Sequence, residues 1–462
     1  MPAASTTRTV AVILAAGLGT RMRSKRPKVL HELCGRPMLG YIIEAARAAT
    51  GAAPLVVYSP ATEAVRDAFP EGVDFCLQEE PRGTGDALRA ALGGLATDAT
   101  DLLVLSGDTP LVRPATVEAL SRQRRSDGAA MTLTVFRPDD ARAYGRVVRD
   151  GREVVRIVEK KDANPGELAI EDLNAGLYAF EAGWLRSRIR SLTPSAATGE
   201  LYLTELVALA RADGRRVTAY ELEDDAELMG IDDRVQLATA EADLRWQIVE
   251  GHLLAGVTMT DPATVYLDAT VDLAEDVTLE ANVILRGATR IGSGTVVGSG
   301  SQVFDSVIGE RCRIWASVLE SAEVEDEVQI GPFAHLRPGA SIGAGAKLGN
   351  FAEVKKSRIG ARTQQHHFSY VGDATVGDDV NIGAGTVTAN YDGRAKHQTV
   401  IGDGAFIGSD TMLVAPVEVA AGAATAAGAV VTRDVPPGKV AIGMPARMRD
   451  RKARAAEADD EH

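Results

Sequence analysis

The chain has 462 residues and a formal net charge of −14. Such a length exceeds one ordinary domain and predicts two or three, while the acidic balance argues against broad electrostatic binding to nucleic acid or to an anionic membrane. The three cysteines fit neither a disulfide framework nor a zinc cluster. No apolar run reaches the roughly 18 residues of a membrane helix, and the first residues do not form a signal segment. We therefore expect a cytoplasmic protein that binds small molecules, without a nucleic-acid partner and without membrane insertion.

Short apolar runs alternate with amphipathic stretches from the start of the chain to about Gly230. This alternation predicts an α/β domain with a mostly parallel, Rossmann-like sheet. The run at residues 232–254 has few helix breakers and a helical apolar spacing, so we expect one long helix that joins this domain to the rest of the chain. The clearest strands of the α/β domain are predicted at residues 10–14, 55–58, 102–105 and 131–136.

The first predicted strand runs directly into a loop of small residues at 15–22. Ligands of open α/β sheets bind beyond the carboxyl ends of the strands, where such a loop presents backbone N–H groups to phosphate. The loop is neither a Walker A motif nor a dinucleotide fingerprint, because no Gly-Lys-Ser/Thr follows it and a third glycine is missing. A plain turn would explain Gly17 and Gly19 equally well. The nearby cations Arg21 and Lys28 favour a site for a triphosphate.

An aspartate follows the predicted strand at residues 102–105, where Ser106 and Gly107 precede Asp108. A carboxylate at the end of a strand, beside a glycine that permits close approach, suits Mg²⁺ bridging nucleotide phosphates. The alternative is an aspartate that caps a turn, since Asp-Thr-Pro begins many turns. Together with the small-residue loop, Asp108 favours a magnesium-dependent nucleotide site.

An apolar residue returns at every sixth position in two stretches of the second half. A helix repeats near 3.6 residues and a half-buried strand at 2, so a period of six indicates one short side of a stacked polygon. Glycine often follows the apolar residue, as at Gly331 and Gly349, and we expect its permissive backbone angles to form tight corners. The pattern predicts a parallel β-helix of about ten coils, and chance spacing in a Val- and Gly-rich region is the alternative. The apolar positions are Val324, Ile330, Leu336, Ile342, Leu348 and Val354, and then Ile401, Ile407, Leu413, Val419 and Val431.

Chemically useful side chains gather where this repeat is interrupted. Residues 364–370 hold two adjacent histidines, and adjacent residues of a strand point to opposite faces, so at most one of His366 and His367 belongs to a site. A solvent-facing histidine is the alternative for either. A second interruption, at residues 389–399, must loop out of the coils, and such insertions gather on a binding face. From Met448 onward the chain lacks an apolar face, and we expect a frayed or disordered tail.

The motifs in combination resemble a known enzyme family. Residues 14–22, residues 27–30 and the pair Gly107-Asp108 are similar to those of the sugar-1-phosphate nucleotidyltransferases. With the hexapeptide half attached, nearly the whole chain resembles the bifunctional N-acetylglucosamine-1-phosphate uridyltransferases and glucosamine-1-phosphate acetyltransferases. The resemblance implies a uridyltransferase domain at 1–232, a linker helix at 233–254, and a left-handed parallel β-helix with a short tail at 255–462 for acetyl transfer. It also implies a homotrimer that shares its active sites between subunits.

The resemblance further implies the residues of the uridyltransferase site. Mg²⁺ would be held by Asp108 and by Asp232, which stands where the family usually has asparagine, and the neighbouring Asp233 is a second candidate for that ligand. The phosphates would face Arg21 and Lys28. The nucleotide would lie against Leu14, Ala15, Ala16, Gly17, Ser106 and Gly107, its uracil against Gln78, Gly83 and Thr84, and the N-acetylglucosamine against Gly145, Glu159 and Asn174.

For the acetyltransferase site, the resemblance implies that His367 is the catalytic base. An amine attacks the thioester of acetyl-CoA only when it is deprotonated, and the backbone N–H of Ala384 would stabilise the oxyanion. Met444 replaces an arginine that often meets the CoA phosphate in the family, and Arg447 is a candidate substitute. Glucosamine-1-phosphate would contact Arg337, Lys355, Tyr370, Asn381, Asn390 and Tyr391, and acetyl-CoA would lie along Ala384, Ser409 and Ala427.

We therefore expect a transferase that acetylates glucosamine-1-phosphate and then transfers UMP from UTP to the product, with Mg²⁺ as cofactor and acetyl-CoA and UTP as co-substrates. Its product would be UDP-N-acetylglucosamine for cell-wall or surface polysaccharide. Two other functions fit the same modules. The β-helix could be a scaffold on a single-activity sugar-1-phosphate nucleotidyltransferase, which His367, Arg337 and Lys355 together argue against. The chain could also be a non-catalytic regulatory subunit, which Lys28 and Asp108 argue against.

Overall fold

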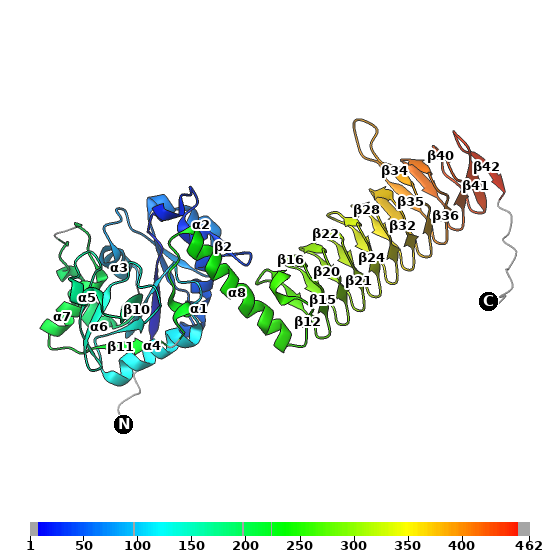
Figure 1. Ribbon diagram of the computed structural model, residues 1–462. Helices are drawn as coiled ribbons and strands as arrows, with labels where there is room; N and C mark the ends of the chain where they lie inside the picture. Colours follow the sequence, from blue (N-terminus) through cyan, green and yellow to red (C-terminus); the bar gives the residue numbers. More distant parts are fainter. Residues whose placement is uncertain (1–7, 96–97, 196–197, 223, 451–462) are drawn as a thin grey trace, which may run out of the picture. The chain divides into compact units, whose positions relative to one another are not determined.

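The computed structural model describes residues 8–95, 98–195, 198–222 and 224–450 (Figure 1). The chain divides into two compact units, Met1–Leu244 and Arg245–His462. The division falls within a long helix, α8 (Arg234–Leu254). Each unit has a hydrophobic core of its own. None of the described helices is both long enough and apolar enough to cross a membrane.

A nine-stranded sheet forms the centre of the first unit. All six residues of β7, an interior strand, are buried. Strands covered on both faces read as continuous apolar runs, which is why the sequence located them without alternation. The order across the sheet is β5 (Asp74–Leu77), β4 (Leu55–Tyr58), β1 (Thr9–Leu14), β6 (Asp101–Ser106), β10 (Leu173–Glu181), β7 (Met131–Phe136), β11 (Val217–Glu221), β9 (Glu153–Val158) and β8 (Arg146–Asp150).

The sheet is mixed rather than mostly parallel, which corrects the expectation from the sequence. β5, β4, β1 and β6 are parallel to one another, as are β7 and β11. β10 is antiparallel to both β6 and β7, and β8 and β9 form an antiparallel hairpin. The sequence argument assumed a helix between successive strands, whereas β8 and β9 are joined by a tight turn, and only antiparallel strands can be joined so directly.

Helices pack on this sheet and place loops at the carboxyl ends of its strands. α1 lies against β1 and α4, and α3 lies against β1, β4 and β5. Two single 3-10 turns, η1 (Thr20–Met22) and η2 (Lys28–Leu30), follow β1 and carry Arg21 and Lys28. A small hairpin of β2 (Glu32–Leu33) and β3 (Arg36–Pro37) comes next. The helices of this unit are α1 (Met38–Thr50), α2 (Ala64–Ala68), α3 (Thr84–Leu92), α4 (Pro114–Asp127), α5 (Pro165–Leu168), α6 (Ala182–Arg188) and α7 (Leu206–Ala212).

The second unit is a β-helix whose three faces are three sheets. The first face consists of β12 (Thr258–Met259), β15 (Thr278–Leu279), β18 (Val296–Val297), β21 (Arg313–Ile314), β24 (Gln329–Ile330), β27 (Lys347–Leu348), β30 (Gln364–Gln365), β33 (Asn381–Ile382), β36 (Phe406–Ile407), β39 (Ala424–Thr425), β41 (Lys439–Ile442) and β42 (Arg447–Asp450). The second face consists of β13 (Tyr266–Leu267), β16 (Ile284–Arg286), β19 (Gln302–Phe304), β22 (Val318–Glu320), β25 (His335–Leu336), β28 (Ala352–Lys355), β31 (Ser369–Gly372), β34 (Val387–Ala389), β37 (Met412–Val414) and β40 (Val430–Val431). The third face consists of β14 (Asp272–Leu273), β17 (Arg290–Ile291), β20 (Val307–Ile308), β23 (Glu323–Val324), β26 (Ser341–Ile342), β29 (Arg358–Ile359), β32 (Ala374–Val376), β35 (Thr399–Ile401) and β38 (Val417–Val419).

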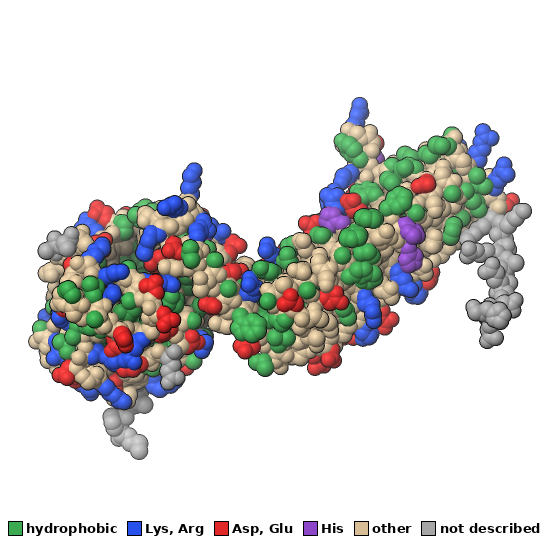
Figure 2. Space-filling model, in the orientation of Figure 1, with side chains coloured by type: hydrophobic (Ala, Val, Ile, Leu, Met, Phe, Trp, Pro, Cys, Tyr) green, Lys and Arg blue, Asp and Glu red, His purple; other side chains and the backbone are tan. Residues whose placement is uncertain are grey.

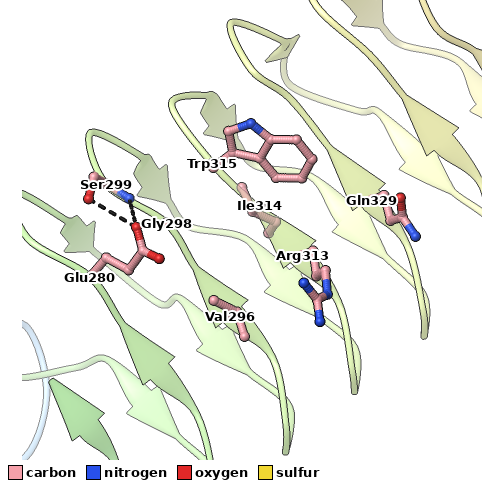
Figure 3. A pocket seen from close by; sticks show the side chains of 8 residues that line it. All are labelled: Glu280, Val296, Gly298, Ser299, Arg313, Ile314, Trp315 and Gln329. Atoms are coloured by element: carbon pink, nitrogen blue, oxygen red, sulfur yellow. Dashed lines mark hydrogen bonds between the residues drawn. The ribbon is translucent and has the colours of Figure 1, made fainter. Parts of the chain in front are cut away.

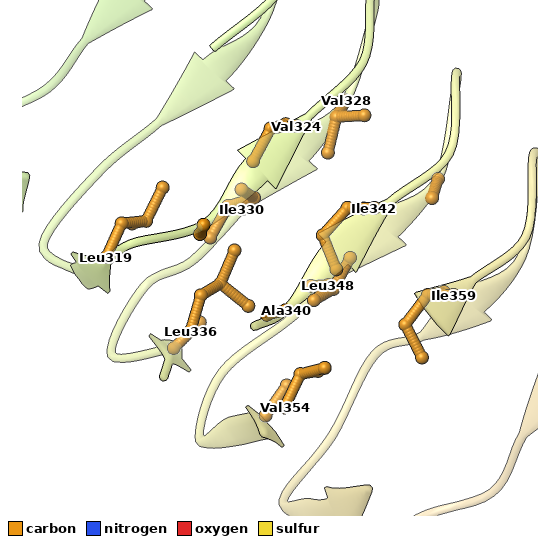
Figure 4. Close-up of a cluster of buried hydrophobic side chains, with 14 of the residues drawn as sticks. Leu319, Val324, Val328, Ile330, Leu336, Ala340, Ile342, Leu348, Val354 and Ile359 are labelled. Atoms are coloured by element: carbon orange, nitrogen blue, oxygen red, sulfur yellow. The ribbon is translucent and has the colours of Figure 1, made fainter. Parts of the chain in front are cut away.

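The interior of the coils confirms the period of six. Ile330, Leu336 and Ile342 are buried and belong to successive faces, and Leu348 begins the next coil on the first face again. Figure 4 shows these side chains pointing into the interior of the stack. Burying one Leu or Ile side chain contributes roughly 1.5–3 kcal/mol. Because these side chains lie on the strands and face the interior, each coil depends on its neighbours to cover them.

The glycines after the apolar positions allow coils to approach closely, which corrects the expected reason for them. Gly349 and Gly360 have no positive φ. A Cβ at Gly349 would lie 1.8 Å from the carbonyl oxygen of His366, and one at Gly360 would lie 2.2 Å from that of Gly377, both on the next coil. Gly331, with φ of 109°, combines a close approach with a left-handed backbone. Other left-handed corners come two or three residues after the apolar position, as at Lys356 and Arg362.

Three segments depart from the regular pattern. The loop between β34 and β35 projects from the coils, as expected for residues 389–399 (Figure 1). α8 begins at Arg234 rather than Asp232, because the Asp233 carboxylate caps it by accepting hydrogen bonds from the next backbone amides. Residues 448–450 belong to β42, which pairs antiparallel with β41, so the expected tail is wrong for these three residues. Main-chain bonds hold this exposed strand without an apolar face, and residues 451–462 lie outside the described residues.

Candidate active sites

A cavity of about 450 Å³ opens at the carboxyl ends of β1 and β6. It gathers most residues that the sequence assigned to the nucleotide: Leu14, Ala16, Gly17, Gln78, Gly83, Thr84, Ser106 and Asp108. Ala15 and Gly107 lie beneath the cavity instead, where the Ala15 amide donates to Val57 O at 2.9 Å and the Gly107 amide donates to Leu14 O at 3.0 Å. Leu18 of the small-residue loop also lines the cavity, as do Pro81 and Glu200, which no motif in the sequence marked.

Gln78 and Thr84 are fixed by local hydrogen bonds at the wall of this cavity. Gln78 is buried, and its amide donates to Asp86 Oδ2 at 2.9 Å. Thr84 begins α3, and its hydroxyl accepts from the Leu203 amide at 3.1 Å. Gly83 has φ of 107°, and a Cβ there would lie 2.6 Å from Leu201 O, so only glycine fits. The wall that would face a base is therefore rigid.

Charged side chains of η1, η2 and two distant turns converge beside the cavity. Lys28 Nζ lies 2.5 Å from Asp108 Oδ2 and 2.9 Å from Asp232 Oδ1, and Arg21 lies 2.9 Å from the same Asp232 oxygen. Burial lowers the pKa of Lys28, but the Asp108 and Asp232 carboxylates outweigh it and raise that pKa above its ordinary value. The Ile231 amide donates to Asp108 O at 2.9 Å and so joins the two acidic turns.

The two acidic candidates for the second metal ligand lie in different environments. The Asp232 carboxylate faces Lys28 and Arg21, whereas Asp233 Oδ1 accepts hydrogen bonds from the amides of Val235 and Gln236, both at 2.9 Å. A carboxylate that caps a helix has its oxygen committed to backbone amides. Asp232 is thus the aspartate that shares the site of Asp108.

The Asp108 and Asp232 carboxylates fit a divalent cation. They already converge on one positively charged group, the Lys28 ammonium, and carboxylate oxygens are the hard ligands that Mg²⁺ prefers. Among the described residues no group of three or more His, Cys, Asp or Glu side chains is placed to hold a metal. Mg²⁺ commonly binds through one or two carboxylates, with waters and substrate phosphates completing its coordination, and the two aspartates suit that mode.

Three residues assigned to the N-acetylglucosamine moiety also lie together. The backbone amide of Asn174 donates to Gly145 O at 2.9 Å, and a Cβ at Gly145 would lie 3.6 Å from Glu159 Oε1. The Thr204 hydroxyl donates to Glu159 Oε1 at 3.2 Å, and burial raises the pKa of Glu159. A register shift in β10 just after Asn174 brings Gly176 against Ser106, whose hydroxyl donates to Gly176 O at 3.2 Å. Neither Thr204 nor this bulge was evident in the sequence.

In the β-helix, strand register aligns four predicted residues at one corner. β30, β33, β36 and β39 pair in sequence, with Gln364 opposite Asn381, Asn381 opposite Phe406, and Phe406 opposite Ala424. The same offsets stack the corner residues of four successive coils, namely His367, Ala384, Ser409 and Ala427. The Ala384 carbonyl accepts a hydrogen bond from the Asp410 amide at 2.6 Å. The backbone amide of Ala384 has no hydrogen-bond partner among the described residues.

The two adjacent histidines lie on this corner and not on a strand, which corrects the argument from opposite faces. β30 ends at Gln365, and both His366 and His367 are exposed. A corner turns the chain, so alternation of faces does not apply there. His366 Nε2 bonds Gln364 Oε1 at 3.0 Å, whereas the His367 ring stays open to solvent next to the aligned corner.

Cationic side chains form a second group at the far end of the second face, where Lys355 lies opposite Gly372. The Lys396 ammonium, in contact with Lys355, lowers the pKa of Lys355, and Arg337 adds to the effect. Like charges that gather in this way favour binding of an anion. Arg337 is held by Glu353 at 2.9 Å, and Lys396 lies 3.7 Å from Asp373 Oδ2. Lys396 was not predicted for the site, although it lies in the insertion that the sequence marked.

The insertion also supplies polar residues to this group. Asn390 is buried, and its amide donates to Asp373 Oδ2 at 2.5 Å and to the Tyr370 hydroxyl at 3.5 Å. Asp392 braces the loop by accepting from the amides of Arg394 and Ala395, both at 2.7 Å. Asn381, on β33, lies on another face from Tyr370 on β31. Tyr391 is 61% exposed and Met444 is 77% exposed, so both are open to a ligand.

Figure 2 shows hydrophobic side chains beside histidines on the surface of the β-helix. Phe333, Phe351 and Phe368 are exposed at equivalent positions of three successive coils, and the rings of Phe333 and Phe351 stack 5.4 Å apart.

A separate cavity of about 780 Å³ lies on the first face of the β-helix (Figure 3). It is lined by Trp315, Arg313, Gln329 and Glu280 among others, and it contains no residue predicted for either site.

Comparisons with known proteins match both halves of the chain. Residues 11–219 match the family model of the MobA-like NTP transferase domain, and residues 321–356 match that of the bacterial transferase hexapeptide. A relative from Pelobacter propionicus, named bifunctional protein GlmU, is 48% identical, with 94% of this chain and 95% of that protein covered. Proteins of the same name from Trichlorobacter lovleyi and Heliobacterium modesticaldum are 47% and 44% identical, with 94% of this chain and 95% and 94% of the relatives covered. The chain belongs to the GlmU family of bifunctional proteins.

Proposed function

We propose that the chain acetylates glucosamine-1-phosphate with acetyl-CoA and then transfers UMP from UTP to N-acetylglucosamine-1-phosphate. The products of the second step are UDP-N-acetylglucosamine and pyrophosphate. The observation that carries this proposal is that two sites of different chemistry lie in separate units of one chain. One is a nucleotide-sized cavity with paired carboxylates and cations, and the other is a β-helix corner that aligns His367 with a free backbone amide.

In the uridyltransferase site, the chain acts by alignment and by neutralising charge. A phosphate oxygen of N-acetylglucosamine-1-phosphate attacks the α-phosphorus of UTP, the bond to the β-phosphate breaks, and pyrophosphate leaves. Lys28 and Arg21 neutralise the developing charge, and the rigid wall at Gln78 and Thr84 orients the nucleotide. Asp108 and Asp232 would hold Mg²⁺, which supplies further charge neutralisation at the phosphates when it is bound.

In the acetyltransferase site, His367 takes the proton from the amine of glucosamine-1-phosphate as nitrogen attacks the thioester carbonyl. The Ala384 amide donates a hydrogen bond to the oxyanion, and the carbon–sulfur bond then breaks to release CoA. The proton returns from His367 to the sulfur. The cationic group of Arg337, Lys355 and Lys396 binds the sugar phosphate, and the corner at Ser409 and Ala427 supports the CoA chain.

We further propose a cytoplasmic homotrimer in which one acetyltransferase site takes residues from two subunits. His367 is exposed, and Asn381 lies on another face from Tyr370 and Lys355. A second subunit against this corner would exclude water and bring an equivalent of Asn381 to the sugar. The exposed phenylalanines at the same corner supply apolar surface for such a contact.

A pair of assays on the purified chain tests the proposal. The first measures CoA release from glucosamine-1-phosphate and acetyl-CoA, and the second measures pyrophosphate release from N-acetylglucosamine-1-phosphate, UTP and Mg²⁺. We expect both reactions to proceed. Pyrophosphate release without CoA release would instead support a single-activity nucleotidyltransferase with a structural β-helix.

A further inference from the structure

A polar side chain replaces an apolar one inside the β-helix immediately before the histidines. Gln365 is 0% exposed and pairs in register with Leu348 of the preceding coil. The equivalent residue of the next coil is Ile382. Burying an amide among apolar side chains is unfavourable unless its hydrogen bonds are made, and Gln365 Oε1 has no partner among the described residues. This position therefore needs an explanation other than core packing.

The amide of Gln365 begins a short chain of hydrogen bonds that ends on His367. Gln365 Nε2 donates to Ser369 Oγ at 2.9 Å, and Ser369 Oγ donates to the backbone carbonyl of His367 at 2.9 Å. From the next coil, the Gly385 amide donates to Phe368 O at 2.7 Å. Two successive carbonyls of the corner are thus fixed, one from inside the β-helix and one from the neighbouring coil.

Thr388, another buried polar residue of the interior, shows how such a side chain usually completes its hydrogen bonds. Thr388 accepts from the Gly372 amide at 2.8 Å and donates to Gly372 O at 3.0 Å, so it completes local backbone bonds. Gln365 makes no such exchange, because among the described residues its side chain bonds only to Ser369. Ser317, at the equivalent position three coils earlier, also donates to the carbonyl two residues before it, at 2.8 Å. What Gln365 adds is a hydrogen bond from inside the β-helix that holds the Ser369 hydroxyl itself.

We infer that Gln365 is a positioning residue for acetyl transfer, acting through Ser369 to fix the corner peptide that sets the direction of the His367 side chain. This inference rests on the proposed role of His367 as the base. A general base works only within hydrogen-bonding reach of the proton that it takes. Fixing the carbonyl of His367 fixes the orientation of its own peptide plane, and hence the path of its side chain toward the amine.

The test compares Gln365→Leu with the matched control Gln364→Leu in the full-length enzyme. A misplacement of about 1 Å can cost about a hundredfold in rate; for a loosened corner we expect kcat of acetyl transfer to fall about tenfold in Gln365→Leu, with both KM values within about twofold. Its melting temperature is expected to be equal or higher, because an unpaired buried oxygen is removed. Gln364→Leu, which alters an exposed glutamine bonded to His366, is expected to retain kcat, and pyrophosphate release is expected to be unchanged in both.

Variants of Ser369 separate positioning from simple packing. Ser369→Ala is expected to lower kcat about as much as Gln365→Leu does. Ser369→Thr, which keeps the hydroxyl, is expected to have a kcat close to that of the wild type. The double variant Gln365→Leu/Ser369→Ala is expected to lose no more than either single variant, since both break the same chain of bonds. An additive loss, or equal activity of Ser369→Ala and Ser369→Thr, would contradict the inference.

His367→Ala distinguishes this inference from the proposed function. Loss of acetyl transfer in His367→Ala together with wild-type kcat in Gln365→Leu would overturn the positioning role alone. Retained acetyl transfer in His367→Ala would overturn the assignment of the base, and the positioning role with it. A lowered melting temperature of Gln365→Leu with both KM values raised would show a packing role instead.

Discussion

Lys28 shows how much of the proposed uridyltransferase site depends on one side chain. It is nearly buried, and both of its closest partners are carboxylates from turns far away in the sequence. The Lys28 ammonium neutralises Asp108 and Asp232, whose carboxylates otherwise would repel each other. A nucleotide with its cation would exchange this arrangement for one in which the carboxylates hold the metal and Lys28 faces phosphate.

Glu159 gives the site a pH-dependent stability. Burial raises its pKa above the ordinary 4.5, so the folded chain keeps the proton at pH values at which the unfolded chain has lost it. The stabilising contribution is therefore complete below about pH 4.5 and disappears as the pH rises through the folded pKa. We expect Glu159→Gln to increase the free energy of unfolding relative to wild type more at pH 7.5 than at pH 4. Urea unfolding of both proteins at the two pH values measures it, and a difference that does not change with pH would contradict the prediction.

Met444 lies at the end of the corner where we propose that acetyl-CoA binds. Ala427 is equivalent in register to Gly443, and Met444 follows it with 77% of its surface exposed. We expect Met444→Arg to lower KM for acetyl-CoA about fivefold, since an exposed charge contact with phosphate contributes about 1 kcal/mol. KM for glucosamine-1-phosphate is expected to stay unchanged. Arg447→Ala tests whether Arg447 takes the place of the arginine that the family often has at position 444. An unaltered KM for acetyl-CoA in this variant would exclude that role.

At the scale of the element, close stacking of coils explains the glycines better than turn geometry does. A Cβ at Gly349 would meet the His366 carbonyl of the next coil at 1.8 Å, whereas one at Gly428, where φ is 70°, would meet nothing within 4 Å. We expect Gly349→Ala to lower the free energy of unfolding by about 3 kcal/mol, as overpacking does. Gly428→Ala is expected to cost only the left-handed backbone strain of about 1 kcal/mol. Thermal unfolding of the two variants measures the difference, and equal costs would refute close packing as the reason for Gly349.

The sequence predicted the elements well where one local rule was sufficient. The six-residue period located the interior of the β-helix, and four apolar runs located strands β1, β4, β6 and β7. It failed where position depends on a partner: the direction of β10, the pairing of β42, and the corner that takes His366 and His367 off a strand. For the same reason Thr204 and Lys396 were missed, because only folding brings them to Glu159 and Lys355.

At the scale of the whole molecule, the predicted homotrimer can be tested by complementation between two inactive variants. If one acetyltransferase site takes His367 from one subunit and Asn381 from the next, two inactive variants can complement each other. We expect co-expressed His367→Ala and Asn381→Ala chains to regain part of the acetyltransferase activity that each lacks alone. Light scattering of the wild type should give three times the mass of one chain. No regained activity in mixed oligomers would place each site within one subunit.

The central claim is that one chain carries two separate active sites. The most direct measurement is the rate of CoA release and of pyrophosphate release in two variants, His367→Ala and Asp108→Asn, under the assay conditions given above. We predict that His367→Ala lowers only CoA release and Asp108→Asn only pyrophosphate release, each by at least about a hundredfold. Loss of both activities from either substitution in a folded protein of unchanged oligomeric state would contradict the claim.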